Sequence, residues 1–375
     1  MRVCYLLNAR YPTEKAYGIL IDSMVRGFIE AGHTVEVAFP RRSAIDPTPL
    51  EGVQYFPFGP RIITKSNWIF FFYRWIGVIL LPPIFARSQA DVVIANDVLQ
   101  VAFAPRSKKV FWDLHDIPAY EHWWRCWFVK RALQRANGII STNQLKLDEL
   151  KKIATLPPSI VLANPVTFDE KVVRAITRAS ARERLNLDSE QKIVVYAGQL
   201  YDWKGVDTLI HAMEFLDRDV STYIVGGMGT DLERCQKLGT KYVHLIFVGM
   251  RPLDEVPFWL RAADIVVLPN SGRFAVSARD TNPMKAIEAV GAGVCMVASD
   301  LPSLHQAIPE GLPAKFFRPD DPKSCADVIR ELFSDPTQRA ELLSRVNSYH
   351  VLSSVERALM LTRWFDGLER SYDLI

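Results

Sequence analysis

The start of one expected helix is the strongest chemical signal in this sequence. Asn282 is a favoured N-cap residue, Pro283 suits the first helical position and Gly293 suits the end, so we expect a helix over residues 283–292. The first backbone N–H groups of such a helix have no partner within it, and its dipole is positive at that end. This helix start therefore predicts a binding site for a diphosphate that needs no metal ion.

Glu288 lies further along the same helix, on the face that it shares with Met284 and Gly291. A carboxylate there could accept hydrogen bonds from the hydroxyl groups of a ribose. The alternative is that Lys285 and Glu288 form an ordinary ion pair on the surface. We favour the ribose-binding interpretation because Glu288 sits within a largely apolar helix.

A second loop begins where an expected strand ends at Gly198. Gln199 follows this glycine, and Lys204 stands just before the next helix. A lysine in this place could stabilise the negative charge of a leaving diphosphate. Because most lysines are simply solvated, the loop alone is a weak signal. Together with the helix start at Asn282 and Pro283, it predicts a phosphate site.

His115 follows an expected strand over residues 109–112 and should therefore lie at the carboxyl edge of a sheet. It could contact a bound sugar, or it could be a structural residue that Asp113 or Asp116 holds in place. The local sequence leaves both interpretations open.

Two other motifs imitate known ligand sites. Asp217 and Asp219 have the spacing of a metal-binding pair, but they fall in a turn between a helix and a strand, where aspartate is favoured for capping. Residues 226–229 are rich in glycine but lack the full spacing and the acidic partner of a dinucleotide fingerprint. We interpret both as turns, and we expect neither a bound metal ion nor a separate cofactor.

Short apolar runs alternate with longer amphipathic segments along the first half of the chain. Such alternation predicts right-handed crossovers and a parallel sheet. The expected strands cover residues 2–7, 34–39, 91–95, 109–112 and 138–141, and the expected helices cover residues 18–31 and 126–136.

The alternation breaks near residues 164–166, passes through a charged stretch to about residue 188 and then restarts. The later strands are expected over residues 193–198, 221–226, 243–248 and 264–268, and the later helices over residues 205–214, 283–292 and 355–372. We therefore predict an α/β protein with two Rossmann-like domains, 1–170 and 171–354, followed by a terminal helix in 355–375. Because ligands of such sheets bind outside the carboxyl ends of the strands, two facing domains would enclose a cleft.

The composition is that of an ordinary folded protein, with 49% hydrophobic and 23% charged residues among 375. A formal net charge of +3 gives no reason to expect nucleic-acid binding. The charge is uneven along the chain, because residues 60–135 hold eleven Lys or Arg against five Asp or Glu, together with six of the nine Trp.

The five cysteines form no C-x-x-C pair, which argues against disulfides and zinc and favours a reducing compartment. The apolar run at the N-terminus is too short for a signal peptide and is expected to form a buried strand.

An aromatic and aliphatic run covers residues 68–83 within this basic window. It contains Arg74, and a pair of prolines closes it after about fourteen apolar residues, fewer than the ~20 needed to span a bilayer. We favour a helix that lies in the membrane interface over a buried helix, and both over a true span. The residues expected to contact an anionic membrane and its acceptor are Trp68, Trp75, Trp123, Trp124 and Trp127.

Taken together, these segments resemble glycosyltransferase family 4, whose members are retaining enzymes of the GT-B fold. The resemblance covers nearly the whole chain and is carried by residues 8–16, 114–116, 196–205, 263–269 and 280–300. It implies two Rossmann-like domains that face each other across a cleft, with residues 355–375 crossing back to the first domain.

By this resemblance, Lys204 stabilises the leaving diphosphate, Glu288 binds the ribose and His115 contacts the donor sugar. The other donor-binding residues are then Gly198, Gln199, Asn282, Pro283 and Met284. Asp280 stands where the family usually has a glutamate that contacts the donor sugar, and Gln199 stands where it usually has an arginine. The resemblance therefore leaves Lys204 and the helix dipole to balance the charge of the leaving group.

The resemblance also implies front-side transfer with retention, in which an oxygen of the departing diphosphate takes the proton of the attacking acceptor hydroxyl. No dedicated protein base is then required. We expect a hexosyltransferase that uses a UDP- or GDP-linked sugar and a lipid-linked or other glycan acceptor, in the cytoplasm at the inner face of the membrane. A sugar-nucleotide epimerase of the same fold and a non-catalytic, membrane-bound sugar-nucleotide-binding protein remain alternatives.

Overall fold

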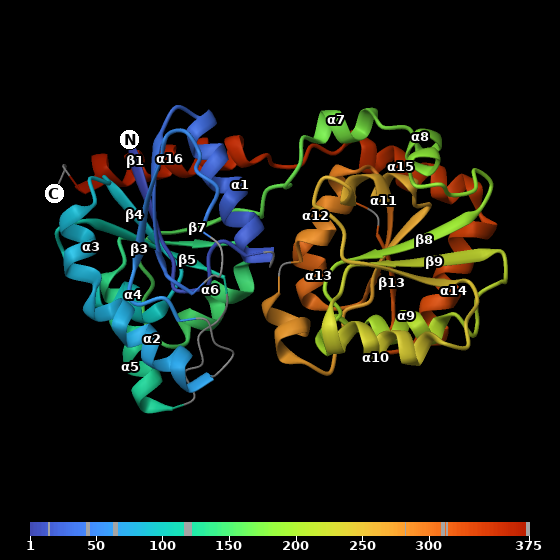
Figure 1. Cartoon of the computed structure of the whole chain (residues 1–375), viewed down its shortest axis with the longest axis horizontal. Coiled ribbons are helices and arrows are strands. Elements are labelled where there is room, and N and C mark those ends of the chain that lie inside the picture. Colours follow the sequence, from blue (N-terminus) through green and yellow to red (C-terminus); the bar gives the residue numbers. More distant parts are fainter. Residues whose placement is uncertain are drawn as a thin grey trace. The chain divides into compact units, whose positions relative to one another are not determined.

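The computed structural model divides the chain into two compact units, each built around one sheet (Figure 1). It describes residues 1–13, 16–42, 46–62, 67–115, 122–281, 283–308, 312 and 314–372, and the side chains of 67–71, 73 and 369–372 are outside the description. Unit 1 comprises Met1–Thr167 and Leu352–Ile375, and unit 2 comprises Phe168–Val351. The boundaries expected from the sequence fall after residues 170 and 354.

Unit 1 contains a parallel sheet with the strand order β3-β2-β1-β4-β5-β6-β7. The strands are β1 (Arg2–Leu6), β2 (Thr34–Pro40), β3 (Val53–Phe58), β4 (Val92–Ala95), β5 (Lys109–Leu114), β6 (Gly138–Ser141) and β7 (Ser159–Val161). Val3 of β1 lies beside Val35 of β2 and Val92 of β4, and all three side chains are buried. Buried aliphatic strands of this kind are typical of a parallel sheet that is covered on both faces.

Helices cover both faces of the unit 1 sheet. They are α1 (Ala16–Glu30), α2 (Asn67–Ile79), α3 (Leu81–Arg87), α4 (Val98–Phe103), α5 (Trp123–Arg135), α6 (Gln144–Lys151) and α16 (Ser354–Tyr372). Helices α3 to α6 share one hydrophobic cluster with the strands, while α16 packs against α1 and places Phe365 on Phe111 of β5, with 4.2 Å between the ring centroids. The last helix of the chain is therefore part of unit 1.

Unit 2 contains a parallel sheet with the strand order β10-β9-β8-β11-β12-β13. The strands are β8 (Lys192–Ala197), β9 (Val220–Val225), β10 (Leu245–Gly249), β11 (Ile265–Leu268), β12 (Cys295–Ser299) and β13 (Lys315–Phe317). The helices are α7 (Glu170–Ala175), α8 (Arg178–Arg184), α9 (Val206–Ala212), α10 (Gly229–Gly239), α11 (Val256–Ala262), α12 (Met284–Gly291), α13 (Pro302–Ala307), α14 (Pro322–Ser334) and α15 (Pro336–Ser348), with short helical turns η1 (Asp202–Lys204) and η2 (Val276–Asp280).

The expected strands and helices are present in both units, with ends that shift by a few residues. Four strands, β3, β7, β12 and β13, were not predicted from the sequence. The first helix of the apolar run, α2, ends at Ile79, and Pro82 and Pro83 occupy the first turn of the next helix, α3. Proline is tolerated there because the first N–H groups of a helix have no partner within it. No helix among the described residues has both the length and the apolar character that crossing a membrane would require.

Candidate functional site

The loop after β8 and the loop between β11 and α12 both lie at the switch point of the unit 2 sheet, where the strand order reverses. β8 lies between β9 and β11, so the chain leaves β8 toward one side of the sheet and later fills the other side from β11 onward. Ligands of open α/β sheets bind outside the carboxyl ends of the strands at such a point. Gly198 follows β8, and residues 269–281 lead from β11 to α12. The topology therefore brings together the two loops that the sequence analysis selected.

Gly198 allows very close packing at the end of β8. Its φ of +141° lies in a region that favours glycine, and an added Cβ would fall 2.5 Å from Cε of Lys285. Gly226 follows β9, and a Cβ there would fall 2.3 Å from the Gly198 carbonyl oxygen. The glycine-rich segment 226–229 is thus the tight connection from β9 to α10 that the sequence predicts, and it packs against the Gly198 turn.

Lys204 lies at the end of η1, in a turn that is fixed to the loop after β11. Gly205 adopts a φ of +65°, and an added Cβ would fall 2.0 Å from the carbonyl oxygen of Pro269. The backbone N–H of Ser271 donates to the Trp203 carbonyl at 3.2 Å. The Lys204 ammonium lies 3.9 Å from the centroid of the Trp203 ring, and burial lowers the pKa of Lys204 to about 8.

Lys285 lies in the first turn of α12 and reaches back over Gly198. Its ammonium donates to the Tyr196 hydroxyl at 2.5 Å, and that hydroxyl donates to the Gln199 carbonyl at 2.5 Å. Burial, and then the nearby charge of Lys204, lowers the pKa of Lys285 well below its usual value, although Glu288 acts in the opposite direction. From the sequence, Lys285 was expected only as a possible surface partner of Glu288. A lysine in the first turn of an otherwise apolar helix was the signal available.

Helix α12 begins at Met284, with Pro283 as its N-cap and no side-chain cap. The prediction that Pro283 takes the first helical position was therefore wrong, and the predicted cap, Asn282, lies outside the described residues. Glu288 is half-buried, and Asp280, also half-buried, ends η2. Gly293 adopts a φ of +68° directly after the helix, which confirms its role as the stop.

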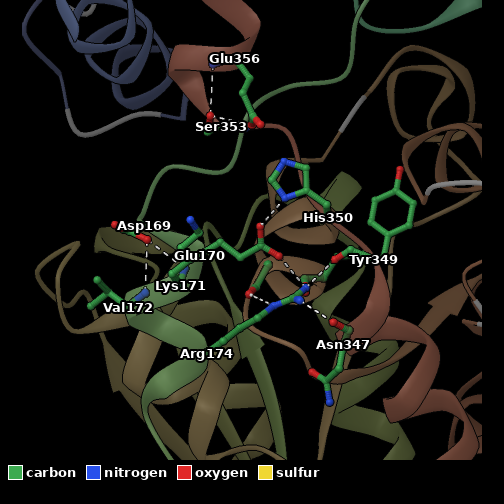
Figure 2. Close-up of polar contacts among 12 residues, drawn as sticks. Asp169, Glu170, Lys171, Val172, Arg174, Asn347, Tyr349, His350, Ser353 and Glu356 are labelled. Atoms are coloured by element: carbon green, nitrogen blue, oxygen red, sulfur yellow. Dashed lines mark hydrogen bonds and ion pairs between the residues drawn. The ribbon is translucent and has the colours of Figure 1, made fainter.

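Arg174 of α7 holds the carboxyl end of α12. Its guanidinium donates to the carbonyl oxygens of Val290 and Gly291, both at 3.1 Å. It also donates to the Asn347 carbonyl at 2.7 Å (Figure 2). It also pairs with Glu170 at 2.7 Å. The last carbonyls of a helix have no partner within it, so one arginine satisfies the ends of both α12 and α15. This anchor fixes the helix whose other end lies at the switch point.

His115 follows β5 in unit 1, and its Nε2 lies 3.0 Å from Oδ2 of Asp113. Lys146 of α6, which is 2% exposed, donates to the His115 carbonyl at 2.5 Å. Although burial raises the pKa of Asp113, the charges of His115, Arg357 and Lys146 outweigh burial and lower that pKa. Asp113 is thus a partner of His115, and Asp116 lies outside the described residues. These contacts orient the ring, and its role toward a sugar stays a prediction.

A polar cluster that was not predicted lies at the switch point of unit 1, where β1 lies beside β4. Asn8 follows β1 and donates to Oδ2 of Asp97 at 3.0 Å, and Arg74 of α2 pairs with the same oxygen at 2.6 Å. Asp97 also caps α4. Arg74 is therefore directed to the carboxyl edge of the sheet. This contact could not be read from the sequence, because residues 8, 74 and 97 lie far apart along the chain.

The tryptophans expected at a membrane differ in their exposure. Trp123, Trp124 and Trp127 of α5 are 83%, 40% and 50% exposed. Trp75 is half-buried and packs on Phe103 and Phe128, with 6.0 and 5.8 Å between ring centroids. The side chain of Trp68 lies outside the described residues. In the described part of α2, Trp75 therefore faces inward while Phe72 and Ile79 are exposed, and α5 presents an aromatic surface to solvent.

One of the two motifs set aside in the sequence, residues 217–219, lies directly before β9. Asp219 forms an ion pair with Lys192 at 2.7 Å. Within the described parts of the chain, no group of three or more His, Cys, Asp and Glu residues could hold a metal ion.

Residues 191–335 match the model of the family described as Glycosyl transferases group 1. This segment lies within unit 2 and contains Gly198, Lys204, Lys285 and Glu288.

Two bacterial proteins show the similarity at the level of sequence. The D-inositol 3-phosphate glycosyltransferase of Xylanimonas cellulosilytica is 28% identical over 204 residues, which cover 52% of this chain and 46% of that protein. D-inositol 3-phosphate glycosyltransferase 1 of Catenulispora acidiphila is 27% identical over 250 residues, which cover 62% of this chain and 58% of that protein. The chain spans about half the length of the curated relatives it matches.

Solved structures extend the similarity over the whole chain. Sucrose-phosphate synthase from Thermosynechococcus elongatus has a TM-score of 0.82 over 99% of both chains, at 18% identity. HepE of Anabaena, in complex with UDP and glucose, has a TM-score of 0.75 over 98% of this chain and 99% of that one, at 16% identity. With two parallel sheets covered by helices, this chain is an α/β protein of the GT-B fold, as expected. Within that class, the match of unit 2 and the bacterial relatives confirm the resemblance to glycosyltransferase family 4.

Proposed function

We propose that the chain is a retaining glycosyltransferase that moves a hexose from a UDP- or GDP-linked sugar without the help of a metal ion. The observation that carries this proposal is the gathering of Lys204, Lys285 and the start of α12 at one switch point. Two cations and a helix N-terminus provide the positive field that a departing diphosphate requires, in a partly buried place where charges act strongly.

In the proposed mechanism, an acceptor hydroxyl attacks C1 of the donor sugar from the side of the diphosphate. The C1–oxygen bond of the diphosphate breaks, and the departing oxygen takes the proton of the hydroxyl. Lys204 stabilises the developing negative charge, while Glu288 binds the ribose and Asp280 the sugar hydroxyls. The bond from His115 to Asp113 fixes the ring of His115 for contact with the donor sugar.

A panel of UDP-, GDP- and ADP-linked sugars tests the donor class by thermal stabilisation, because a ligand that binds only the native state raises the unfolding temperature. We expect one nucleotide to stabilise the protein in EDTA and to be released as the diphosphate when an acceptor is present. Conversion of the donor sugar without an acceptor would favour the epimerase. Tight binding without turnover for any acceptor would favour the non-catalytic module.

We further propose that unit 1 attaches to an anionic membrane in the cytoplasm and takes a lipid-linked acceptor. Support comes from the exposed Trp123 and Trp127, with Arg125 and Arg131 on the same helix. Tryptophan favours the headgroup level, and each basic residue near an anionic surface contributes about 1 kcal/mol. The relatives are named for D-inositol 3-phosphate, so a phosphorylated acceptor is tested beside the lipid.

A groove on unit 1 supports an acceptor with an anionic head and an apolar chain. Its cavity volume is about 410 Å³, and it is lined by Arg41, Tyr55, Phe56, Pro57, Phe58, Gly59, Leu80, Pro83, Ile84 and Arg87. Arg41 and Arg87 are exposed, and neither forms an ion pair in the described part of the chain. Two guanidinium groups beside aromatic walls suit a phosphate that carries a hydrocarbon tail.

Liposome flotation tests the membrane proposal. We expect the protein to rise with anionic vesicles and scarcely with neutral ones, and to detach as salt is added. Changing Trp123 and Trp127 to Ser, or Arg41 and Arg87 to Gln, should reduce flotation. The matched control is Phe215→Ser, because Phe215 is 41% exposed but belongs to unit 2. A folded wild type that stays at the bottom with anionic vesicles at low salt would disprove attachment and leave the transferase proposal intact.

A further inference from the structure

Lys204 and Lys285 are two partly buried cations that lack a carboxylate partner at ion-pair distance among the described residues. Removing a charge from water without an opposite charge destabilises the folded protein, and two like charges near each other add repulsion. Structures retain such arrangements mainly at functional sites, where a ligand offsets the cost. The two lysines therefore indicate a binding site for an anion.

The contacts of Lys285 would allow its ammonium to leave the Tyr196 hydroxyl and bind a ligand instead. Its ammonium is held by one neutral phenol, that of Tyr196, at 2.5 Å, and it lies 3.8 Å from the centroid of the same ring. A bond to a neutral oxygen is weaker than a bond to a carboxylate, so a ligand phosphate can compete for the ammonium. Because Gly198 has no side chain, the side chain of Lys285 can cross directly above the turn that follows β8.

We infer that Lys285 is a second diphosphate-binding residue, which acts with Lys204 on a ligand that carries at least two negative charges. The inference rests on the proposed function and adds a residue to the donor site. Lys285 binds the phosphates from the first turn of α12, where the free N–H groups of the helix also lie, while Lys204 binds them from the turn after β8.

Proton uptake on binding follows from this arrangement. Burial lowers the pKa of Lys204 to about 8, so part of the population carries an uncharged Lys204 near pH 8, and a bound dianion raises that pKa again. The pKa of Lys285 is also lowered in the free protein, so a bound dianion acts on it in the same direction. Lys204 alone takes up about half a proton at pH 8, and Lys285 adds to that amount. A purely structural Lys285 that only holds the Tyr196 hydroxyl predicts no such addition.

Isothermal titration calorimetry tests the inference, in two buffers of different ionisation enthalpy at pH 8. UDP, GDP, ADP and inorganic pyrophosphate are the probes. We expect the wild type to bind a nucleoside diphosphate with proton uptake, and Lys285→Met to bind it about 10- to 100-fold more weakly with less uptake, the scale of one charge-assisted contact. Lys237→Met, which removes an exposed lysine on α10, is the matched control and should bind as the wild type does.

Tyr196→Phe separates binding from a structural role, because it removes the hydroxyl and keeps the lysine. Under the inference, this variant retains proton uptake and binds within about threefold of the wild type, since the ligand replaces the phenol as partner. Equal losses in Tyr196→Phe and Lys285→Met, or a Lys285→Met affinity equal to that of the wild type, overturn the inference. Failure of the wild type to bind any of the four probes overturns the inference and the proposed function together. Binding that depends on Lys285 but never leads to sugar transfer overturns the proposed function alone.

Discussion

The side chain of Lys285 passes directly over Gly198, so that a single methyl group on Gly198 would lie 2.5 Å from Cε of Lys285. The turn after β8 and the first turn of α12 are thereby fitted to each other at the switch point of unit 2.

Gly198→Ala should therefore weaken the binding of a nucleoside diphosphate by about tenfold or more, because it displaces Lys285. It also places alanine at a φ of +141°, which should cost of order 1–3 kcal/mol of unfolding free energy. Gly249→Ala is the control, since its φ of +73° gives similar strain but an added Cβ meets none of the described residues within 4 Å. Calorimetry and urea unfolding separate the two effects. Equal loss of binding in both variants would show that strain, and not displacement of Lys285, is responsible.

Gln199→Arg should partly restore binding to Lys285→Met. The carbonyl of Gln199 already accepts from the Tyr196 hydroxyl beneath Lys285, so an arginine at this position would bring a guanidinium to the place that the ammonium leaves. We expect a gain of about three- to tenfold in diphosphate affinity at low salt. Gln236→Arg, which adds the same charge on the exposed side of α10, should give no gain in the same background. A double variant no tighter than Lys285→Met would contradict the prediction.

The value of kcat/KM for the donor should fall above about pH 8. Burial lowers the pKa of Lys204 to about 8 in the free protein, so the cation is lost as the pH rises through that value. The value of kcat should fall at higher pH than kcat/KM, because the bound diphosphate raises the pKa of Lys204. A pH–rate profile from pH 6 to 10 measures both values. A kcat/KM that stays constant to pH 10 would argue against a role for Lys204 as a cation.

In the ligand-free protein, the contribution of Lys204 to the free energy of unfolding should rise with pH, whereas kcat/KM falls. The folded-state pKa of Lys204, about 8, lies below the unfolded value of 10.5, so the unfolded chain binds more protons between these values and stability from this group rises with pH there. Lys204→Met removes the buried charge and should be more stable than the wild type at pH 7, with a difference that shrinks toward pH 10. Urea unfolding at the two pH values measures it, and a difference that grows with pH would contradict the assignment.

Much of the donor site could be predicted because a parallel sheet gathers the carboxyl ends of its strands at one edge. Lys204 and Glu288 were therefore expected near each other from their positions after β8 and within α12. The role of Lys285 could not be predicted in this way. Its side chain can reach the turn after β8 only because Gly198 in that turn has no side chain. β3 escaped prediction because it is a half-exposed edge strand with Pro57 inside it, so its sequence lacks the apolar run of a central strand.

Arg174→Ala should destabilise unit 2, because it removes the guanidinium that binds the Gly291 and Asn347 carbonyls at the ends of α12 and α15. We expect a loss of about 2–4 kcal/mol in the free energy of unfolding, the scale of breaking a partly buried charged network. Arg345→Ala on the outer face of α15 removes a more exposed arginine and should cost less than about 1 kcal/mol. Equal losses in the two variants would show that Arg174 does not anchor α12.

The most direct measurement of the central claim is sugar transfer itself. The wild type and Lys204→Ala are incubated in EDTA with the nucleotide sugar that gives the largest thermal stabilisation, and with lipid-linked glycan and phosphorylated inositol acceptors. Release of the nucleoside diphosphate and the anomeric configuration of the product are then measured. The account predicts a product that retains the configuration of the donor sugar, and a kcat lower by about 10²- to 10³-fold in Lys204→Ala. A product of inverted configuration, activity that appears only with Mg²⁺ or Mn²⁺, or a Lys204→Ala activity within about twofold of the wild type would contradict it.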